Sequence, residues 1–172
     1  EALYCEPDGT FPNHEANPLN PLNMRDLQAA VLSEKCDLGI AFDGDADRAC
    51  FCDETGALVG NDIVTALLAN DLVAREPGAH VVYDLRSSRV VPQTIRKLGG
   101  NPVRERVGHA YMKATLRRFA GPYGGELSGH FYFRDLWYTD SAVYAAGLVL
   151  GQVARAAEPF SKMLAPLRRY PT

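Results

Sequence analysis

The sequence predicts an α/β protein in which a mixed, mostly parallel sheet is sandwiched between helices and preceded by a partial α/β domain. From residue 79 onward, short apolar runs alternate with segments of helical periodicity, the order that parallel strands and their crossover helices produce. The residues before about 60 offer only one helix and two or three strands, too few for a complete α/β domain. We therefore expect a boundary near 57–61, with a partial domain over 1–58 and a second domain over 59–172.

The composition is that of an ordinary globular protein. The chain has 172 residues, of which 47% are hydrophobic and 23% charged, and a formal net charge of −3. This slightly acidic balance argues against a nucleic-acid or anionic-membrane surface. No apolar run reaches the ~18 residues of a membrane span, and the first residues lack the basic and apolar regions of a signal peptide. The spacing of the four cysteines matches no zinc motif and favours buried free thiols in a reducing cytoplasm.

The first part of the chain predicts a long loop, one helix and two strands. Residues 5–22 are dense in Pro, Asn, Asp and Gly, which predicts an irregular surface loop, and a loop of this length is uncommon unless it has a function. Apolar residues three or four apart predict a helix over 24–35, with Asn23 as its cap. Two short apolar runs predict strands over 37–42 and 48–53.

The second part predicts helices and strands in alternation. An apolar stripe predicts a helix from Asp62 to about Arg75, which the pair Pro77-Gly78 would end. Further helices are expected over 88–98, 109–119 and 140–154, and strands over 79–83, 102–107 and 130–133.

The stretch Asp43-Gly-Asp-Ala-Asp-Arg48 is the first that carries chemistry. In an extended segment, alternate residues point the same way, so Asp43, Asp45 and Asp47 would converge. Three carboxylates repel one another, and an all-oxygen site of this kind suits Mg²⁺. Arg48 adds a planar cation that can pair with phosphate. A calcium-binding EF-hand is excluded because Arg48 stands where that loop needs glycine.

Two further stretches hold polar groups suited to a sugar phosphate. In Gly124-Gly-Glu-Leu-Ser-Gly-His130, alternation would bring Glu126, Ser128 and His130 to one side, while the glycines allow close approach to a ligand. Taken alone, this stretch is better explained by a turn that leads into a strand. Around 104–113, Gly108 and His109 mark a strand-to-helix junction, where backbone N–H groups favour anions. The nearby cations are Lys113, one helical turn beyond His109, and Arg86.

Together these stretches resemble the α-D-phosphohexomutase superfamily, in particular its bacterial phosphomannomutase/phosphoglucomutase branch. Asp43-Gly-Asp-Ala-Asp-Arg48 is similar to the family's metal-binding loop, and Gly125-Glu-Leu-Ser-Gly-His130 to its sugar-binding loop. Gly108-His-Ala-Tyr-Met-Lys113 is similar to an element that positions the sugar, and Asp8-Gly-Thr-Phe-Pro-Asn-His14 also resembles this branch. The order and spacing agree along nearly the whole chain. On this resemblance the chain covers the latter part of the family's second domain and the whole of its third.

The resemblance implies an enzyme that interconverts hexose 1-phosphate and hexose 6-phosphate through a phosphoserine and a hexose 1,6-bisphosphate. It implies Mg²⁺ on the three aspartates and stabilisation of the transferred phosphoryl group by Arg48. Glu126 and Ser128 would hold sugar hydroxyls. The residues that would position the sugar or transfer protons are Arg86, Gly108, His109, Lys113 and His130.

The family's phosphoserine loop and its phosphate-binding fourth domain do not occur in this sequence, so we expect the chain alone to lack mutase activity. Its partners would be mannose or glucose 1- and 6-phosphate, the bisphosphate, and the missing domains of the same polypeptide. Two alternatives remain open. One is a stand-alone α/β module that binds sugar phosphate or Mg²⁺. The other is a Mg²⁺-dependent phosphatase that forms an aspartyl-phosphate on Asp43.

Overall fold

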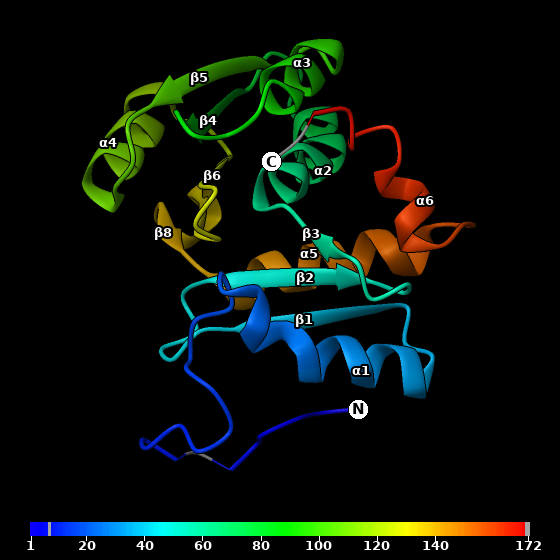
Figure 1. The fold of residues 1–172 in the computed structure, drawn as a ribbon. Helices are drawn as coiled ribbons and strands as arrows, with labels where there is room; N and C mark the ends of the chain where they lie inside the picture. The colour runs from blue at the N-terminus through cyan, green and yellow to red at the C-terminus, as the bar shows by residue number, and fades with distance from the viewer. Residues whose placement is uncertain (7, 171–172) are drawn as a thin grey trace.

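The computed structural model describes residues 1–6 and 8–170; Pro7, inside the predicted opening loop, lies outside the described residues. It contains a three-stranded and a five-stranded sheet with helices packed around both (Figure 1). The predicted mixed α/β fold with helix-flanked sheets is confirmed. None of the helices in the described part of the chain is long and apolar enough to cross a membrane.

The first sheet consists of three antiparallel strands in the order β1-β2-β3: β1 (Leu38–Phe42), β2 (Ala49–Asp53) and β3 (Leu58–Val59). A 3₁₀ turn, η1 (Pro21–Met24), leads into α1 (Arg25–Glu34), which packs on β1. The side chain of Asn20 caps η1, so the predicted cap at Asn23 is wrong by three positions. Phe42 pairs with Ala49, so the aspartate-rich stretch forms the connection of a β1–β2 hairpin.

The second sheet has the order β5-β4-β6-β7-β8. Its strands are β4 (His80–Asp84), β5 (Asn101–Glu105), β6 (Tyr123–Gly125), β7 (Phe131–Phe133) and β8 (Thr139–Asp140). β4 is parallel to β5 and β6, whereas β7 and β8 are antiparallel to their neighbours. The segments that follow the carboxyl ends of β4, β5 and β6 therefore meet at one edge, where open α/β sheets bind ligands.

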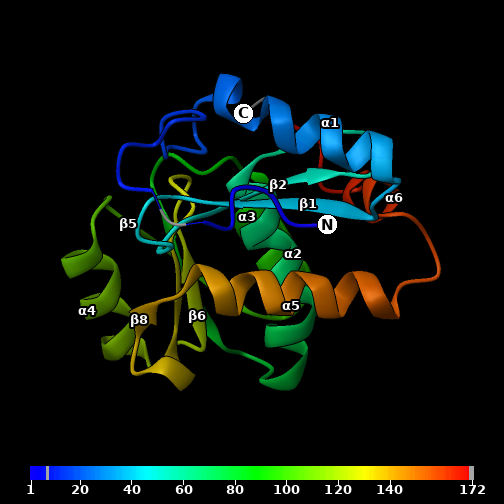
Figure 2. The same cartoon turned by 90° about the horizontal axis from the view of Figure 1, so that it is seen from below.

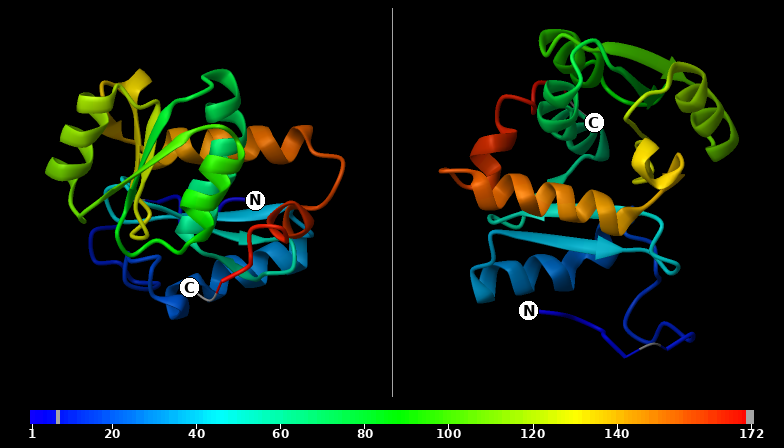
Figure 3. Two further views of the ribbon diagram at one scale, coloured as in Figure 1. Left: turned by 90° about the horizontal axis from the view of Figure 1, so that it is seen from above. Right: turned by 180° about the vertical axis from the view of Figure 1, so that it is seen from behind.

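The helices of this part follow the predicted positions closely. They are α2 (Asn61–Arg75), α3 (Val90–Lys97), α4 (His109–Phe119), α5 (Ala142–Arg155) and α6 (Phe160–Leu164), with a 3₁₀ turn, η2 (Arg134–Leu136), after β7. α4 lies on one face of the sheet, and α2 and α3 lie on the other (Figure 3).

Two local expectations are corrected. Gly124 and Gly125 were expected in a loop but belong to strand β6. A Cβ atom on Gly125 would lie 2.1 Å from the Thr65 hydroxyl oxygen, so only glycine lets α2 approach the strand this closely. The last long helix was expected to begin at Asp140, but Ser141 caps α5 and Asp140 belongs to β8. Asp140 is thereby free to face the site described below.

A single apolar cluster contains residues from both sheets. Phe51 and Val59 of the first sheet pack together with buried residues of α2, α5 and the second sheet, such as Leu67, Val149 and Phe131. The three-stranded sheet lies between α1 and α5 (Figure 2). The relative positions of the two sheets are therefore fixed by a shared core, because moving one against the other would expose that apolar surface.

All four cysteines are free thiols. Cys50 and Cys52 are buried in β2, as expected, and burial raises the pKa of both thiols, that of Cys52 to about 11. The expectation of burial is wrong for Cys5, which is exposed in the opening loop, and Cys36 is only partly buried.

Candidate functional site

The aspartate loop, Asp43 to Arg48, forms a compact turn. Ala46 has a positive φ of 58°, and its N–H donates to the Asp43 carbonyl at 3.1 Å. The expected extended geometry is therefore wrong, yet the convergence that it predicted occurs. One carboxylate oxygen from each of Asp43, Asp45 and Asp47 lies within 4.8 Å of the others. Phe11 and Ala16 of the opening loop lie over Gly44, so the long loop covers this turn.

The charges of the loop fit a divalent cation. Asp43 is buried, which by itself raises its pKa, but hydrogen bonds from the backbone N–H (3.0 Å) and Nε (2.5 Å) of Arg48 lower the pKa overall. The pKa of Asp47 is raised by burial and by the charges of Asp43 and Asp45, which outweigh the opposing effect of His130. Negative charge in the loop is therefore incompletely compensated by its neighbours. Three oxygen donors with this imbalance fit Mg²⁺.

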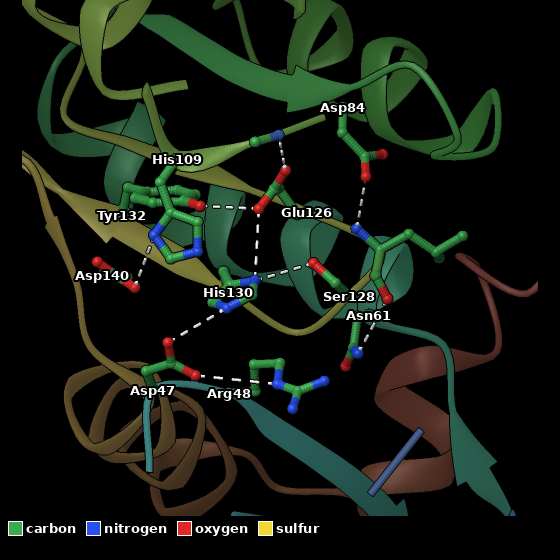
Figure 4. A network of polar contacts seen from close by, with 12 residues as sticks. Asp47, Arg48, Asn61, Asp84, His109, Glu126, Ser128, His130, Tyr132 and Asp140 are labelled. Atoms are coloured by element: carbon green, nitrogen blue, oxygen red, sulfur yellow. Dashed lines mark hydrogen bonds and ion pairs between the residues drawn. The ribbon is translucent and has the colours of Figure 1, made fainter. Parts of the chain in front are cut away.

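Glu126, Ser128 and His130 lie in the tight connection between β6 and β7. The connection is a turn closed by the Gly129 N–H, which donates to the Glu126 carbonyl, and Gly129 has a φ of 93°. The three side chains converge through this turn and not through strand alternation. The Ser128 hydroxyl lies 2.9 Å from Nδ1 of His130 (Figure 4).

The carboxylate of Glu126 is almost completely buried, at 1% exposure. It accepts hydrogen bonds from the Gly108 N–H at 2.9 Å and from the Tyr132 hydroxyl at 2.7 Å, and it lies 3.4 Å from Nδ1 of His130. Burial alone would raise its pKa, but the hydrogen bonds from His130, Gly108 and Tyr132 outweigh burial and lower the pKa to about 2. Glu126 is therefore an ionised carboxylate at neutral pH.

Backbone contacts bring the aspartate loop and the Glu126–His130 turn together. The Ala49 N–H donates to the Gly129 carbonyl at 3.1 Å, and Arg48 and His130 form an isolated β-bridge. From the side chains, Nε2 of His130 lies 3.4 Å from Asp47. Two segments about eighty residues apart in the sequence thus form one site.

His109 and Lys113 meet at Asp140. His109 is the first residue of α4, and Lys113 follows one turn later. Nδ1 of His109 lies 3.3 Å from one oxygen of Asp140, and Nζ of Lys113 lies 2.7 Å from the other. The burial of Asp140 by itself raises its pKa, but the hydrogen bond from Lys113 lowers it overall. The His109 ring also packs edge-on against that of His130, with centroids 4.4 Å apart.

Arg86 lies at the carboxyl end of β4. Its guanidinium donates to the buried carboxylate of Asp84 at 2.7 and 3.0 Å, so its charge is compensated locally. The same Asp84 oxygen accepts the N–H of Leu127, and Asn61 donates to the Leu127 carbonyl (Figure 4). Asp84 and Asn61 therefore hold the Glu126–His130 turn in place from behind.

Four residues of the site were not expected from the sequence: Asn61, Asp84, Tyr132 and Asp140. Asp84 could have been found, because it ends an apolar run in the sequence, much as Asp43 directly follows one. Asp140 carries no local signal, because its position beside His109 and Lys113 depends on the pairing of β8 with β7.

Comparisons with known proteins identify the family of the chain. Residues 60–170 match the family model described as phosphoglucomutase/phosphomannomutase, alpha/beta/alpha domain III, and residues 2–56 match the model for alpha/beta/alpha domain II. A phosphomannomutase of Methanocaldococcus jannaschii is 36% identical over 165 residues, which are 96% of this chain and 37% of that protein. A phosphomannomutase/phosphoglucomutase of Pseudomonas aeruginosa is 40% identical over 149 residues, 86% of this chain and 32% of the relative.

A solved structure of a phosphoglucomutase/phosphomannomutase family protein from Burkholderia thailandensis superposes with a TM-score of 0.89 at 36% identity. The match covers 94% of this chain and 35% of that one. The chain thus spans about a third of the length of the curated relatives that it matches. With both family models matched in order along nearly all of its length, the chain belongs to the phosphoglucomutase/phosphomannomutase family of the α-D-phosphohexomutase superfamily.

Proposed function

We propose that this chain is the metal- and sugar-binding part of a phosphohexomutase, which interconverts hexose 1-phosphate and hexose 6-phosphate through a phosphoserine and a bisphosphorylated sugar. The observation that carries the proposal is the backbone contact of Ala49 with Gly129, which sets the aspartate loop beside the Glu126–His130 turn. Transfer of a phosphoryl group to a sugar hydroxyl requires such a neighbourhood, because the cation and the groups that orient the hydroxyl act on the same bond.

In this proposal Asp43, Asp45 and Asp47 hold Mg²⁺, which when bound neutralises charge on the transferring phosphoryl group. Arg48 orients Asp43 through its Nε atom, and its side chain, 26% exposed, would stabilise the charge of the transferring phosphoryl group. An aspartyl-phosphate on Asp43 is disfavoured, because both of its oxygens accept hydrogen bonds from Arg48. The chain therefore supports the mutase over the phosphatase.

Glu126 and Ser128 accept hydrogen bonds from sugar hydroxyls, and the ionised state of Glu126 makes it a strong acceptor. His109, Lys113 and His130 position the sugar and move protons at its hydroxyl oxygens. Burial by itself lowers the pKa of His130, but Glu126 and Asp47 raise it overall, which favours a proton donor near neutral pH.

Gly108 contributes to sugar binding by fixing Glu126, and Arg86 contributes the N–H groups that are not paired with Asp84, at the carboxyl end of β4. We place the boundary between the two family domains at residues 58 and 59. The phosphoserine and the groups that hold the second phosphate come from other parts of the full-length polypeptide. Mannose and glucose phosphates are the proposed substrates, on the likeness of the Phe11–His14 stretch, and free thiols fit a cytoplasmic location.

The first test is a calorimetric titration of the chain with Mg²⁺. We expect the Asp45→Ala variant to lose binding and the matched Asp37→Ala variant, an exposed aspartate outside the loop, to keep it. Glucose 1-phosphate or mannose 1-phosphate is then titrated in the presence of Mg²⁺, and Ser128→Ala should weaken its binding. Equal Mg²⁺ binding by wild type and Asp45→Ala would refute the metal site. Turnover by the chain alone would refute the need for an external phosphoserine.

A further inference from the structure

Four side chains beside the metal loop form a second cluster of potential metal ligands. Asp47, His109, His130 and Asp140 each place one nitrogen or oxygen atom within 4.8 Å of the others (Figure 4). We propose that this cluster is a separate binding site for a borderline divalent cation of the Zn²⁺ or Co²⁺ type. It shares only Asp47 with the aspartate loop.

Two of the six distances between ligand atoms in the cluster match those of a tetrahedral site. With metal–nitrogen and metal–oxygen bonds of about 2.1 Å, neighbouring ligand atoms of a tetrahedron lie about 3.4 Å apart. Nδ1 of His109 lies 3.3 Å from Oδ2 of Asp140, and Nε2 of His130 lies 3.4 Å from Oδ2 of Asp47. Both pairs are longer than a strong charged hydrogen bond of about 2.8 Å. Each of these two pairs of ligand atoms can therefore accommodate a small cation with little rearrangement.

Neighbouring groups leave the required ligand atoms available. Nδ1 of His130 faces the Ser128 hydroxyl at 2.9 Å and Glu126 at 3.4 Å, so Nδ1 keeps a proton and Nε2 is the nitrogen that gives up its proton to bind a metal. A carboxylate behind a histidine in this way orients metal-binding imidazoles in many proteins. In Asp140, Lys113 occupies Oδ1 at 2.7 Å, which leaves Oδ2 for the ion.

The donor set distinguishes this cluster from the aspartate loop. Two imidazoles and two carboxylates favour Zn²⁺ and Co²⁺, whereas three carboxylates favour Mg²⁺. Two negative charges from Asp47 and Asp140 balance a dication. The ammonium group of Lys113 beside Asp140 opposes tight binding, so the site would bind the ion reversibly and not as a permanent structural metal.

Occupancy would affect the activity in a defined direction. An ion in the cluster takes Asp47 from the aspartate loop and occupies the faces of His109 and His130. Zn²⁺ would therefore inhibit by competing with both Mg²⁺ and the sugar. This consequence rests on the proposed function, whereas the existence of the site does not.

The test is a Co²⁺ titration of the chain followed by visible absorption, because tetrahedral Co²⁺ has intense ligand-field bands and no sugar phosphate is needed. We expect one such ion per chain. His109→Ala and Asp140→Asn should each weaken binding by about ten-fold or more, by analogy with losses on removing groups around metals. Two control variants should keep the bands. Asp45→Asn alters only the aspartate loop, and His80→Gln replaces a histidine at the first residue of β4, at the end away from the site.

Comparing the Co²⁺ bands of these variants distinguishes binding at the four-residue cluster from binding at the aspartate loop. Bands that survive both His109→Ala and Asp140→Asn, or that vanish in Asp45→Asn alone, would place the ion in the aspartate loop and overturn the proposal. The absence of tetrahedral bands in the wild-type chain would overturn it too. Circular dichroism melts of each variant verify that the fold is intact, and Asp140→Asn provides the test if His109→Ala does not fold. If the wild-type chain shows the Co²⁺ bands but does not bind glucose 1-phosphate or mannose 1-phosphate, that result would count against the proposed function only.

Discussion

Replacing Glu126 by glutamine removes only one formal charge, but we expect it to destabilise the folded chain strongly. The carboxylate accepts from two buried or partly buried donors, the Gly108 N–H and the Tyr132 hydroxyl, and it faces Nδ1 of His130. Glutamine offers one oxygen and one NH₂ group in the same space. At least one donor therefore loses its acceptor or meets another donor, and His130 loses the negative charge beside it.

The magnitude follows from the pKa. A carboxyl group with an ordinary pKa of 4.5 that falls to about 2 in the fold is stabilised in its ionised form. At about 1.4 kcal/mol per pKa unit, this corresponds to about 3 kcal/mol at neutral pH. Because the pKa is lower in the folded state, the contribution is complete above pH 4.5 and is lost as the pH falls toward 2. We expect Glu126→Gln to lower the free energy of unfolding by about 2–3 kcal/mol at pH 7.

Urea unfolding followed by circular dichroism measures this difference. Glu105→Gln is the matched control, since Glu105 also accepts from a hydroxyl, that of Thr115, and from a backbone N–H but is more exposed. We expect the control to lose less than about 1 kcal/mol. The gap between wild type and Glu126→Gln should also narrow at low pH. Equal destabilisation by the two variants, or a gap that does not change with pH, would refute the argument.

Two further predictions concern packing and a buried ion pair. Gly125→Ala should lower the free energy of unfolding by about 1–3 kcal/mol, because its Cβ would overlap Thr65. Gly147→Ala in α5, where a Cβ meets nothing within 4 Å, should raise it by about 0.5–1 kcal/mol in the same urea unfolding experiments. Arg168→Met should lower the free energy of unfolding by about 1–3 kcal/mol, because it removes the guanidinium that lies 2.7 Å from the fully buried Asp53. If Arg168→Met lowers it equally in an Asp53→Asn background, this ion pair is not the cause.

Much of the fold could be predicted because its signals are local. The helix over His109–Phe119 and the strand near 79–83 follow from periodicity and from the glycines and prolines between elements. β6 was missed because its three residues, Tyr123–Gly125, contain two glycines. Their presence in a strand is explained by the close approach of Val82 to Gly124 and of Thr65 to Gly125, contacts between distant segments that no local pattern encodes.

The site divides in the same way. The three aspartates and the Glu126–His130 group could be identified from residue type and spacing, although both segments are turns and not extended strands. Alternation is one way for side chains to converge, and a tight turn with a positive φ is another. Asp140 and Tyr132 could not be assigned, because their roles depend on which strand pairs with β7 and on which side α4 packs.

The joint between the two family domains has a direct bearing on the chemistry. The aspartate loop belongs to the first sheet and the Glu126–His130 turn to the second, so their spacing depends on how rigidly the sheets are joined. Helix α5 packs against both β2 and α2, and Arg168 near the end of the chain reaches Asp53 at the end of β2. A shift of one ångström at this joint would separate the aspartate loop from the Glu126–His130 turn by the same amount, which in the proposed function is enough to impair positioned catalysis greatly. In the proposed function, the shared core therefore holds the aspartate loop and the Glu126–His130 turn at the spacing that the reaction requires.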